Sequence, residues 1–362
     1  MPRVKRWGLC FMLLAILLLT PTAMAAPYWA KPGVYIKYAA MRYDPYIKYM
    51  IEKGNPPRAI NTAELMYLYR GILFRIYAKN DTNVTFRFLR EERGYMTVAL
   101  EIAMSNVTIM TIVRKDTKIP RFWDEKQVIW EKIEKSHDVG FLDCIWPQVK
   151  LKTLEIRKFY RIRLSDGTVF DMNGTAYGHT ILWVNTTNPP VPGSIFGKWE
   201  ESVITVYNTS TPRKSVMTYY RKFGPPVMVT LFSVPGMNLS QRVDSQRNYT
   251  LLSMTVFGPS GSAIYDPSSG MVIAPVAYAL GIIPDLRAAG IVFATFTDEH
   301  SAYLAFAKHD SSWASGLVLY GTNAWLGGVE RLPFPKPRTQ SEYVFYASLL
   351  ILAVSVVKKA GR

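Results

Sequence analysis

The chain has 362 residues, of which 49% are hydrophobic and 19% are charged, as expected of a folded protein with a large core. Its 43 Lys and Arg residues outnumber the 27 Asp and Glu residues, which gives a formal net charge of +16 at pH 7. Two cysteines are too few for a disulfide-stapled scaffold or a cysteine-rich zinc module.

The N-terminus has the three parts of a secretory signal. Residues 1–6 are basic, residues 7–19 form an uncharged apolar run, and residues 23–25 form an A-x-A cleavage motif. We therefore predict a signal peptide over the first 25 residues, cleaved between Ala25 and Ala26. An uncleaved anchor helix is the alternative.

Residues 26–118 are predicted to be rich in β-strands. Apolar and polar side chains alternate with a period of two along 84–88 and 95–104, which is typical of half-buried strands. Residues 107–113 are rich in β-branched side chains and are expected to continue the meander. The stretch 60–79 combines a helix-capping pattern with a strand-like pattern, so both structures stay open there.

Residues 119–150 are predicted to form a helical insert, with its clearest helix over 120–137. Acidic residues come early and basic residues late in that stretch, which suits the helix dipole. Its apolar residues recur at the spacing of one helix face: Phe122, Ile129, Trp130 and Ile133.

Residues 151–330 are predicted to form a second β-rich region. Asp166-Gly167 and Asn173-Gly174 separate three strand-like runs, and both dipeptides are preferred in type I′ hairpin turns. We therefore predict a three-stranded meander. A further hairpin is expected over 262–274, and 271–296 is expected to contain buried strands rather than a second transmembrane helix. The predicted fold is a mainly β, antiparallel sandwich or curved meander with one or two helices.

The C-terminus is predicted to anchor the chain in a membrane. A Pro-rich stalk over 331–342 precedes the uncharged apolar run 343–357 and the basic tail 358–362. Fifteen helical residues span about 22 Å, and the lysines that follow can extend this reach toward the hydrocarbon thickness of ~30 Å. By the positive-inside rule, the basic flanks of both apolar segments are expected on the cytoplasmic side of the membrane. The region between the two segments is then expected outside. A buried terminal helix is the alternative.

Eight N-glycosylation sequons of the form Asn-x-Ser/Thr lie between the two apolar ends. The chain has only twelve asparagines, and chance would produce one or two sequons, so this number indicates an exported glycoprotein. The sequon asparagines are Asn80, Asn83, Asn106, Asn173, Asn185, Asn208, Asn238 and Asn248. In layout alone, the chain resembles the exported, C-terminally anchored surface glycoproteins of archaea. The resemblance covers the ends and the sequons, not the region between them.

No catalytic residue, metal ligand or cofactor site is predicted. The histidines His137, His179, His300 and His309 have no zinc-motif spacing, and no nucleotide-binding or nucleophile-elbow motif occurs. Cys144 is expected to be a small buried hydrophobe. Arg161 and Arg163 share one strand face and form a small basic stripe. The 22 tyrosines and 9 tryptophans suit carbohydrate stacking, but in a β-rich protein they are expected mainly in the core.

We interpret the chain as an exported, glycosylated, single-pass membrane protein of the cell surface. Its β-rich ectodomain is expected to bind or scaffold a partner. The basic composition favours an anionic envelope glycan or lipid headgroups as partners, and export argues against nucleic acid. A membrane-anchored extracytoplasmic hydrolase and a carrier of a lipid or small ligand are the alternatives. Converging acids and histidines in a deep pocket favour the hydrolase, and an apolar sheet concavity favours the carrier.

Overall fold

The computed structural model describes most of the region between the two apolar ends. The described residues are 26–42, 52–54, 61–135, 144–199, 202–212, 215–234, 237–239, 243–244, 249–250, 254–256, 259–275, 283–298 and 316–326. The signal peptide, stalk, transmembrane segment and basic tail predicted from the sequence lie outside these residues. Within the described ranges, no helix is both long and apolar enough to cross a membrane.

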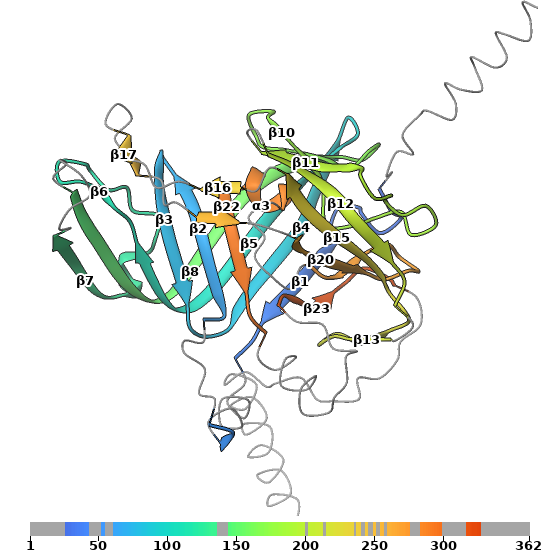
Figure 1. Cartoon of the computed structure of the whole chain (residues 1–362), viewed down its shortest axis with the longest axis horizontal. Helices are drawn as coiled ribbons and strands as arrows, with labels where there is room; N and C mark the ends of the chain where they lie inside the picture. Colours follow the sequence, from blue (N-terminus) through green and yellow to red (C-terminus); the bar gives the residue numbers. More distant parts are fainter. Residues whose placement is uncertain are drawn as a thin grey trace, which may run out of the picture.

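The protein is mainly β, as predicted, and its described strands form one large curled antiparallel sheet with three small ones (Figure 1). The 17 strands of the large sheet are β1 (Tyr35–Ala40), β2 (Ala63–Tyr69), β3 (Ile72–Ala78), β4 (Thr82–Glu92), β5 (Tyr95–Met110), β6 (Val113–Arg114), β7 (Val128–Lys135), β8 (Cys144–Arg163), β9 (Thr168–Phe170), β10 (Ala176–His179), β11 (Ile195–Trp199), β12 (Ser202–Ser210), β15 (Val227–Val234), β20 (Pro259–Tyr265), β21 (Val272–Ala274), β22 (Ile291–Phe296) and β23 (Val318–Thr322).

The remaining described elements are short. The small sheets pair β13 (Val216–Met217) with β14 (Lys222–Phe223), β16 (Met237–Leu239) with β19 (Met254–Val256), and β17 (Val243–Asp244) with β18 (Tyr249–Thr250). The helical elements are the 3₁₀ turn η1 (Glu125–Gln127) and the helix α3 (Pro284–Ala288).

The large sheet is built on a long two-stranded ribbon, β5 paired with β8 from Tyr95–Arg163 to Met110–Gln148. Each edge of the ribbon carries two strands end to end. On the β5 edge these are β4 and β3, and on the β8 edge they are β9 and β7. The ribbon therefore divides the sheet into branches that leave it at different points along its length.

Three branches extend from the ribbon. One continues through β4, β1 and β23, and a second through β3, β2 and β22. The third runs from β9 through β10, β11, β12, β15 and β20 to β21. The first and third branches meet inside the curl, where the Tyr38 hydroxyl of β1 donates a hydrogen bond to the Val272 carbonyl of β21 (2.8 Å).

The alternation predicted for 84–88 and 95–104 is confirmed, because Val84, Phe86 and Phe88 are buried, and so are the even-numbered residues from Met96 to Met104. The alternation then shifts by one position, so that Val107 and Ile109 are the buried residues. β8 shows the same shift opposite, from Val149 and Leu151 to Leu154 and Ile156. The shift in β5 occurs at Asn106, whose φ of 54° departs from the regular strand.

The hairpins predicted at Asp166-Gly167 and Asn173-Gly174 are confirmed, but their turn type is different. Gly167 and Gly174 have positive φ, whereas Asp166 and Asn173 do not, so neither turn is type I′. In the second turn, the Asp171 carboxylate accepts hydrogen bonds from the backbone N–H groups of Asn173 and Thr175. This Asx interaction stabilises a type I turn followed by a left-handed glycine.

Two other hairpins do have type I′ turns, at Arg70-Gly71 and Arg93-Gly94. All four residues have positive φ, and each dipeptide forms the two-residue loop of a tight hairpin. The first of these turns resolves the ambiguous stretch 60–79 as the hairpin β2–β3. The hairpin predicted over 262–274 is also confirmed, by the pairing of β20 with β21.

The helix predicted over 120–137, within the proposed insert 119–150, is wrong. The chain forms the short turn η1 there and then the strand β7, which pairs with the first part of β8. Ile129, Trp130 and Ile133 are exposed, so the helical spacing of these residues does not mark a core-facing side. The partner offered by the long strand β8 outweighs a local helical preference, because the β-branched residues of β7 suit a strand equally well.

The core lies inside the curl and includes several large aromatic side chains. Trp29, Phe88 and Trp183 are buried and pack on one another, and the ring centroids of Trp29 lie 5.9 Å from Phe88 and 6.0 Å from Trp183. The Trp29 indole N–H also donates a hydrogen bond to the Ser269 carbonyl (2.8 Å). These contacts join segments that are far apart in the sequence.

Gly178 and Gly94 offer a matched test of this geometry. A Cβ at Gly178 (φ 121°) would lie 2.6 Å from the Phe196 carbonyl oxygen and closer still to Gly197, whereas a Cβ at Gly94 (φ 77°) would meet nothing within 4 Å. We expect Gly94→Ala to cost about 1 kcal/mol of unfolding free energy, from its backbone conformation alone. Gly178→Ala should cost about 3 kcal/mol or more, because β10 and β11 must separate. Denaturant unfolding of both variants measures the difference, and equal costs would contradict the close approach of these strands.

Candidate functional site

A buried polar centre in the described structure surrounds the carboxyl of Asp285, in the first turn of α3. Its side chain has no exposed surface and is held by three donors. The Tyr160 hydroxyl (2.9 Å) and the Thr180 hydroxyl (2.6 Å) donate to Oδ1, and the Ile181 backbone N–H (2.8 Å) donates to Oδ2. Asp285 therefore ties α3 to β8 and to the residues that follow β10.

Burial raises the pKa of the Asp285 carboxyl to about 6, although the hydrogen bonds from Thr180, Ile181 and Tyr160 act in the opposite direction. Tyr38 and Tyr265 also lie close enough to interact electrostatically with this carboxyl, and burial raises the pKa of both phenols. Within the described structure, the Tyr265 hydroxyl has no hydrogen-bond partner. The centre is thus an enclosed acid among neutral phenols.

Enclosure limits what this centre does chemically. A perturbed carboxyl is a frequent mark of an active site, but an acid that transfers a proton to a substrate must reach it. The carboxylate oxygens of Asp285 are directed at chain groups and shielded from solvent, so its geometry is that of a structural clasp. No local pattern marks Asp285 in the sequence, because one aspartate after Pro284 resembles an ordinary helix start.

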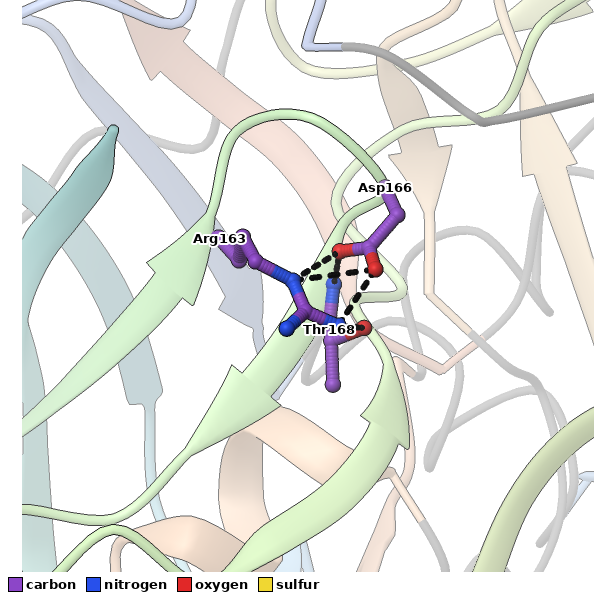
Figure 2. A network of polar contacts seen from close by, with 3 residues as sticks. All are labelled: Arg163, Asp166 and Thr168. Atoms are coloured by element: carbon purple, nitrogen blue, oxygen red, sulfur yellow. Dashed lines mark hydrogen bonds and ion pairs between the residues drawn. The ribbon is translucent and has the colours of Figure 1, made fainter. Parts of the chain in front are cut away.

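A second polar network lies at the turn between β8 and β9 (Figure 2). The Arg163 guanidinium donates to both carboxylate oxygens of Asp166 (3.0 Å from Nε to each), and the Thr168 backbone N–H donates to the same carboxylate (3.0 Å). Partial burial raises the pKa of Asp166, but these bonds outweigh it and lower the value to about 2. Asp166 is therefore an anion that fixes the turn.

The two arginines of the predicted basic stripe, Arg161 and Arg163, make different local contacts. Arg163 pairs with Asp166, and the Arg161 guanidinium lies over the Tyr95 ring, 5.8 Å from its centroid. His179 lies nearby on β10, and burial lowers the pKa of its imidazole while Asp166 acts in the opposite direction. These contacts stabilise the strand face, and of the two arginines Arg163 is the one paired with a carboxylate.

Lys158 occupies an aromatic environment on β8. Its ammonium nitrogen lies 5.5 Å from the Tyr67 ring centroid and 5.2 Å from the Tyr69 centroid, and Phe122 packs edge-on against both rings. Burial raises the pKa of Tyr67 to about 12, so its ring is a neutral phenol at pH 7. Cation–π attraction thus links the β2 branch to the ribbon.

The other residues considered as chemical candidates are not brought together. Cys144 is buried at the start of β8, as expected. His137, His300 and His309 lie outside the described residues. Within the described ranges, no group of three or more His, Cys, Asp or Glu side chains is arranged to hold a metal ion.

None of the six sequon asparagines whose side chains are described is buried. Asn173 and Asn208 are exposed, and Asn80, Asn83, Asn106 and Asn185 are partly exposed. The Asn185 Oδ1 atom accepts hydrogen bonds from the Thr187 N–H (3.1 Å), the Thr187 hydroxyl (2.7 Å) and the Asn188 N–H (3.2 Å). All three bonds are made to the oxygen of this amide. The side chains of Asn238 and Asn248 lie outside the described part.

Two aromatic side chains stand out from the surface. Trp325 is 77% exposed and Tyr28 is 57% exposed, with ring centroids 6.3 Å apart. The Tyr28 hydroxyl donates to the Trp325 carbonyl (2.9 Å), and the Asn323 side chain bonds to the backbone at Gly33 and Tyr35. The first and last described segments are thus fastened together beneath an exposed aromatic pair.

Comparisons of the chain with the models of known protein families, with curated proteins and with solved structures find no match.

The clasp at Asp285 predicts a distinctive dependence of stability on pH. Because its pKa is raised on folding from 3.8 to about 6, its stabilising contribution is complete below pH 4, falls as the pH rises to 6, and is constant above that. This difference amounts to on the order of 3 kcal/mol. We expect the unfolding free energy of the wild type, minus that of Asp285→Asn, to fall by that amount between pH 4 and pH 6.5. Taking the difference between the two proteins cancels the pH-dependent contributions of His179 and Asp166 to the unfolding free energy, because both proteins contain these residues.

Tyr160→Phe provides the second measurement. It removes one donor from the carboxyl and leaves Asp285 ionisable, so the pH range of the fall should move upward. A difference between wild type and Asp285→Asn that does not vary with pH would contradict a raised pKa at Asp285.

Proposed function

We propose that this chain is an exported, glycosylated surface protein, anchored in the membrane by its C-terminal apolar segment, whose β-rich body binds or scaffolds a partner at the envelope. Export and membrane anchoring are proposed from the sequence of the two apolar ends, which lie outside the described residues. An anionic envelope glycan or lipid headgroups fit the basic composition as partners.

The observation that carries a binding or scaffolding role is the packed interior of the curl. Trp29, Phe88 and Trp183 pack on one another there, and Asp285 is enclosed by its own hydrogen bonds. A carrier holds its ligand in an apolar concavity, and a hydrolase presents its acid to a substrate. Among the described residues, these three rings occupy part of the interior, and the oxygens of Asp285 are directed at groups of the chain itself. Recognition is therefore proposed at the outer surface.

Two surface features support this proposal. The sequon asparagines with described side chains all reach the surface, as attachment of a glycan requires. The rings of Tyr28 and Trp325 are both exposed and lie beside each other, so they offer an aromatic surface to a partner.

Two neighbouring threonines test the glycoprotein part of the proposal. Thr187→Ala destroys the sequon of Asn185, whereas Thr186→Ala keeps it and removes only a hydrogen bond to the Pro267 carbonyl. We expect Thr187→Ala to lower the mass of the native protein by one glycan and Thr186→Ala to leave the glycan in place. Intact-protein mass spectrometry from the native host measures both. Unmodified asparagine at all eight sequons would contradict the proposal.

Deletion of residues 343–362 tests the anchor. We expect the shortened chain to be released from the membrane fraction in soluble form, because this deletion removes the apolar run and its basic flank. Fractionation before and after a high-salt wash measures the release. A shortened chain that stays in the membrane fraction after the wash would show that another segment or a partner holds it there.

A further inference from the structure

Strand β7 presents an exposed edge with apolar side chains. Among the described strands it pairs only with β8, and its residues 129–134 are exposed on both faces. Ile133 is 66% exposed, and Ile129 and Trp130 are exposed as well. A free strand edge carries unpaired backbone N–H and C=O groups and is a template for pairing with another strand.

The charges along this edge alternate in sign. Lys132 and Glu134 lie on the same face and form an ion pair with each other, while Glu131 lies on the other face and pairs with Arg121 (3.2 Å). The ion-paired side chains are still 39–50% exposed. A run of one sign would repel a second strand of the same sequence, whereas this alternation allows one to dock.

We propose that β7 is a dimerisation edge, at which the β7 strands of two copies of this chain pair antiparallel with Ile133 on the two-fold axis. Each Lys132 then lies opposite Glu134 of the second copy. The register also sets Glu131 opposite position 135, which is a lysine in the sequence. The sheets of the two copies become continuous through this contact.

The geometry of antiparallel strands limits the possible registers, and charge matching favours this one. Directly opposed residues point to the same side of the sheet, so a symmetric pair is centred on a residue and not between two residues. Centring on Glu131, Lys132 or Glu134 places a charge against its own copy, and like charges directly opposed are destabilising. Centring on Ile133 places the two Ile133 side chains opposite each other. It also places each neighbouring charged residue opposite a residue of the other sign.

The same register predicts the effect of charge reversal. In Lys132→Glu, both cross-strand pairs bring acid against acid, and in Glu134→Lys both bring base against base. We expect each variant alone to dimerise about tenfold more weakly or worse than the wild type. Mixed together, the two variants oppose acid to base at both pairs, so they should form a heterodimer. The double variant Lys132→Glu/Glu134→Lys should recover the homodimer.

The experiment uses the full-length chain, with a different tag on each single variant. Light scattering after size-exclusion chromatography measures the mass of each species, and co-purification through one tag measures the heterodimer. Recovery of pairing in the mixture also shows that each single variant is folded. A wild type that is monomeric at about 100 μM, single variants that dimerise like the wild type, or a mixture that does not pair would each overturn the proposal.

A cysteine on the axis gives an independent readout. Directly opposed residues of an antiparallel pair have Cβ atoms about 5 Å apart, so Ile133→Cys should cross-link two chains under mild oxidation. Ile129→Cys is the matched control, because it is also exposed but would lie roughly 27 Å from its copy in this register. Equal cross-linking of both variants, or none at position 133, would overturn the register.

Discussion

The β5–β8 ribbon is the constraint on which the rest of the described fold depends. Fifteen cross-strand pairs hold two long strands together, and each edge of the ribbon then supports two shorter strands in line. The shift in alternation at Asn106 falls where the neighbour on one edge changes from β4 to β3. The irregular residue therefore lies at the point where the sheet branches.

The sequence predicted the strands whose inward-facing side chains are uniformly apolar, such as 95–104, because burial of one face imposes strict alternation. It failed where two periodicities fit the same residues. Phe122, Ile129, Trp130 and Ile133 suit a helix face, and only the distant strand β8 decides that residues 128–135 are a strand. The turn types were not predicted either, because they depend on how the flanking strands pair. Arg93 adopts a left-handed conformation because the pairing of β4 with β5 requires it.

The buried centre was beyond prediction for a related reason. Asp285 is separated from Tyr160 and from Thr180 by more than one hundred residues, and only the completed fold brings it to them. No local pattern distinguishes an aspartate that is enclosed from one that caps a helix at the surface. The sequons are the opposite case, because a sequon is defined by three consecutive residues. Their number and positions were available from the sequence, and the structure adds only the exposure of their side chains.

The contact between β1 and β23 sets the order in which this protein is completed. The Thr322 hydroxyl binds the Tyr35 carbonyl across 287 residues, so one of the first strands to be synthesised is covered by the last described one. At typical rates of synthesis, roughly 15 to 60 s separate the appearance of the two strands. Throughout that interval one edge of β1 lacks its neighbour. An unpaired strand edge is a template for pairing with another strand, so the late arrival of β23 leaves β1 open to such pairing for that time.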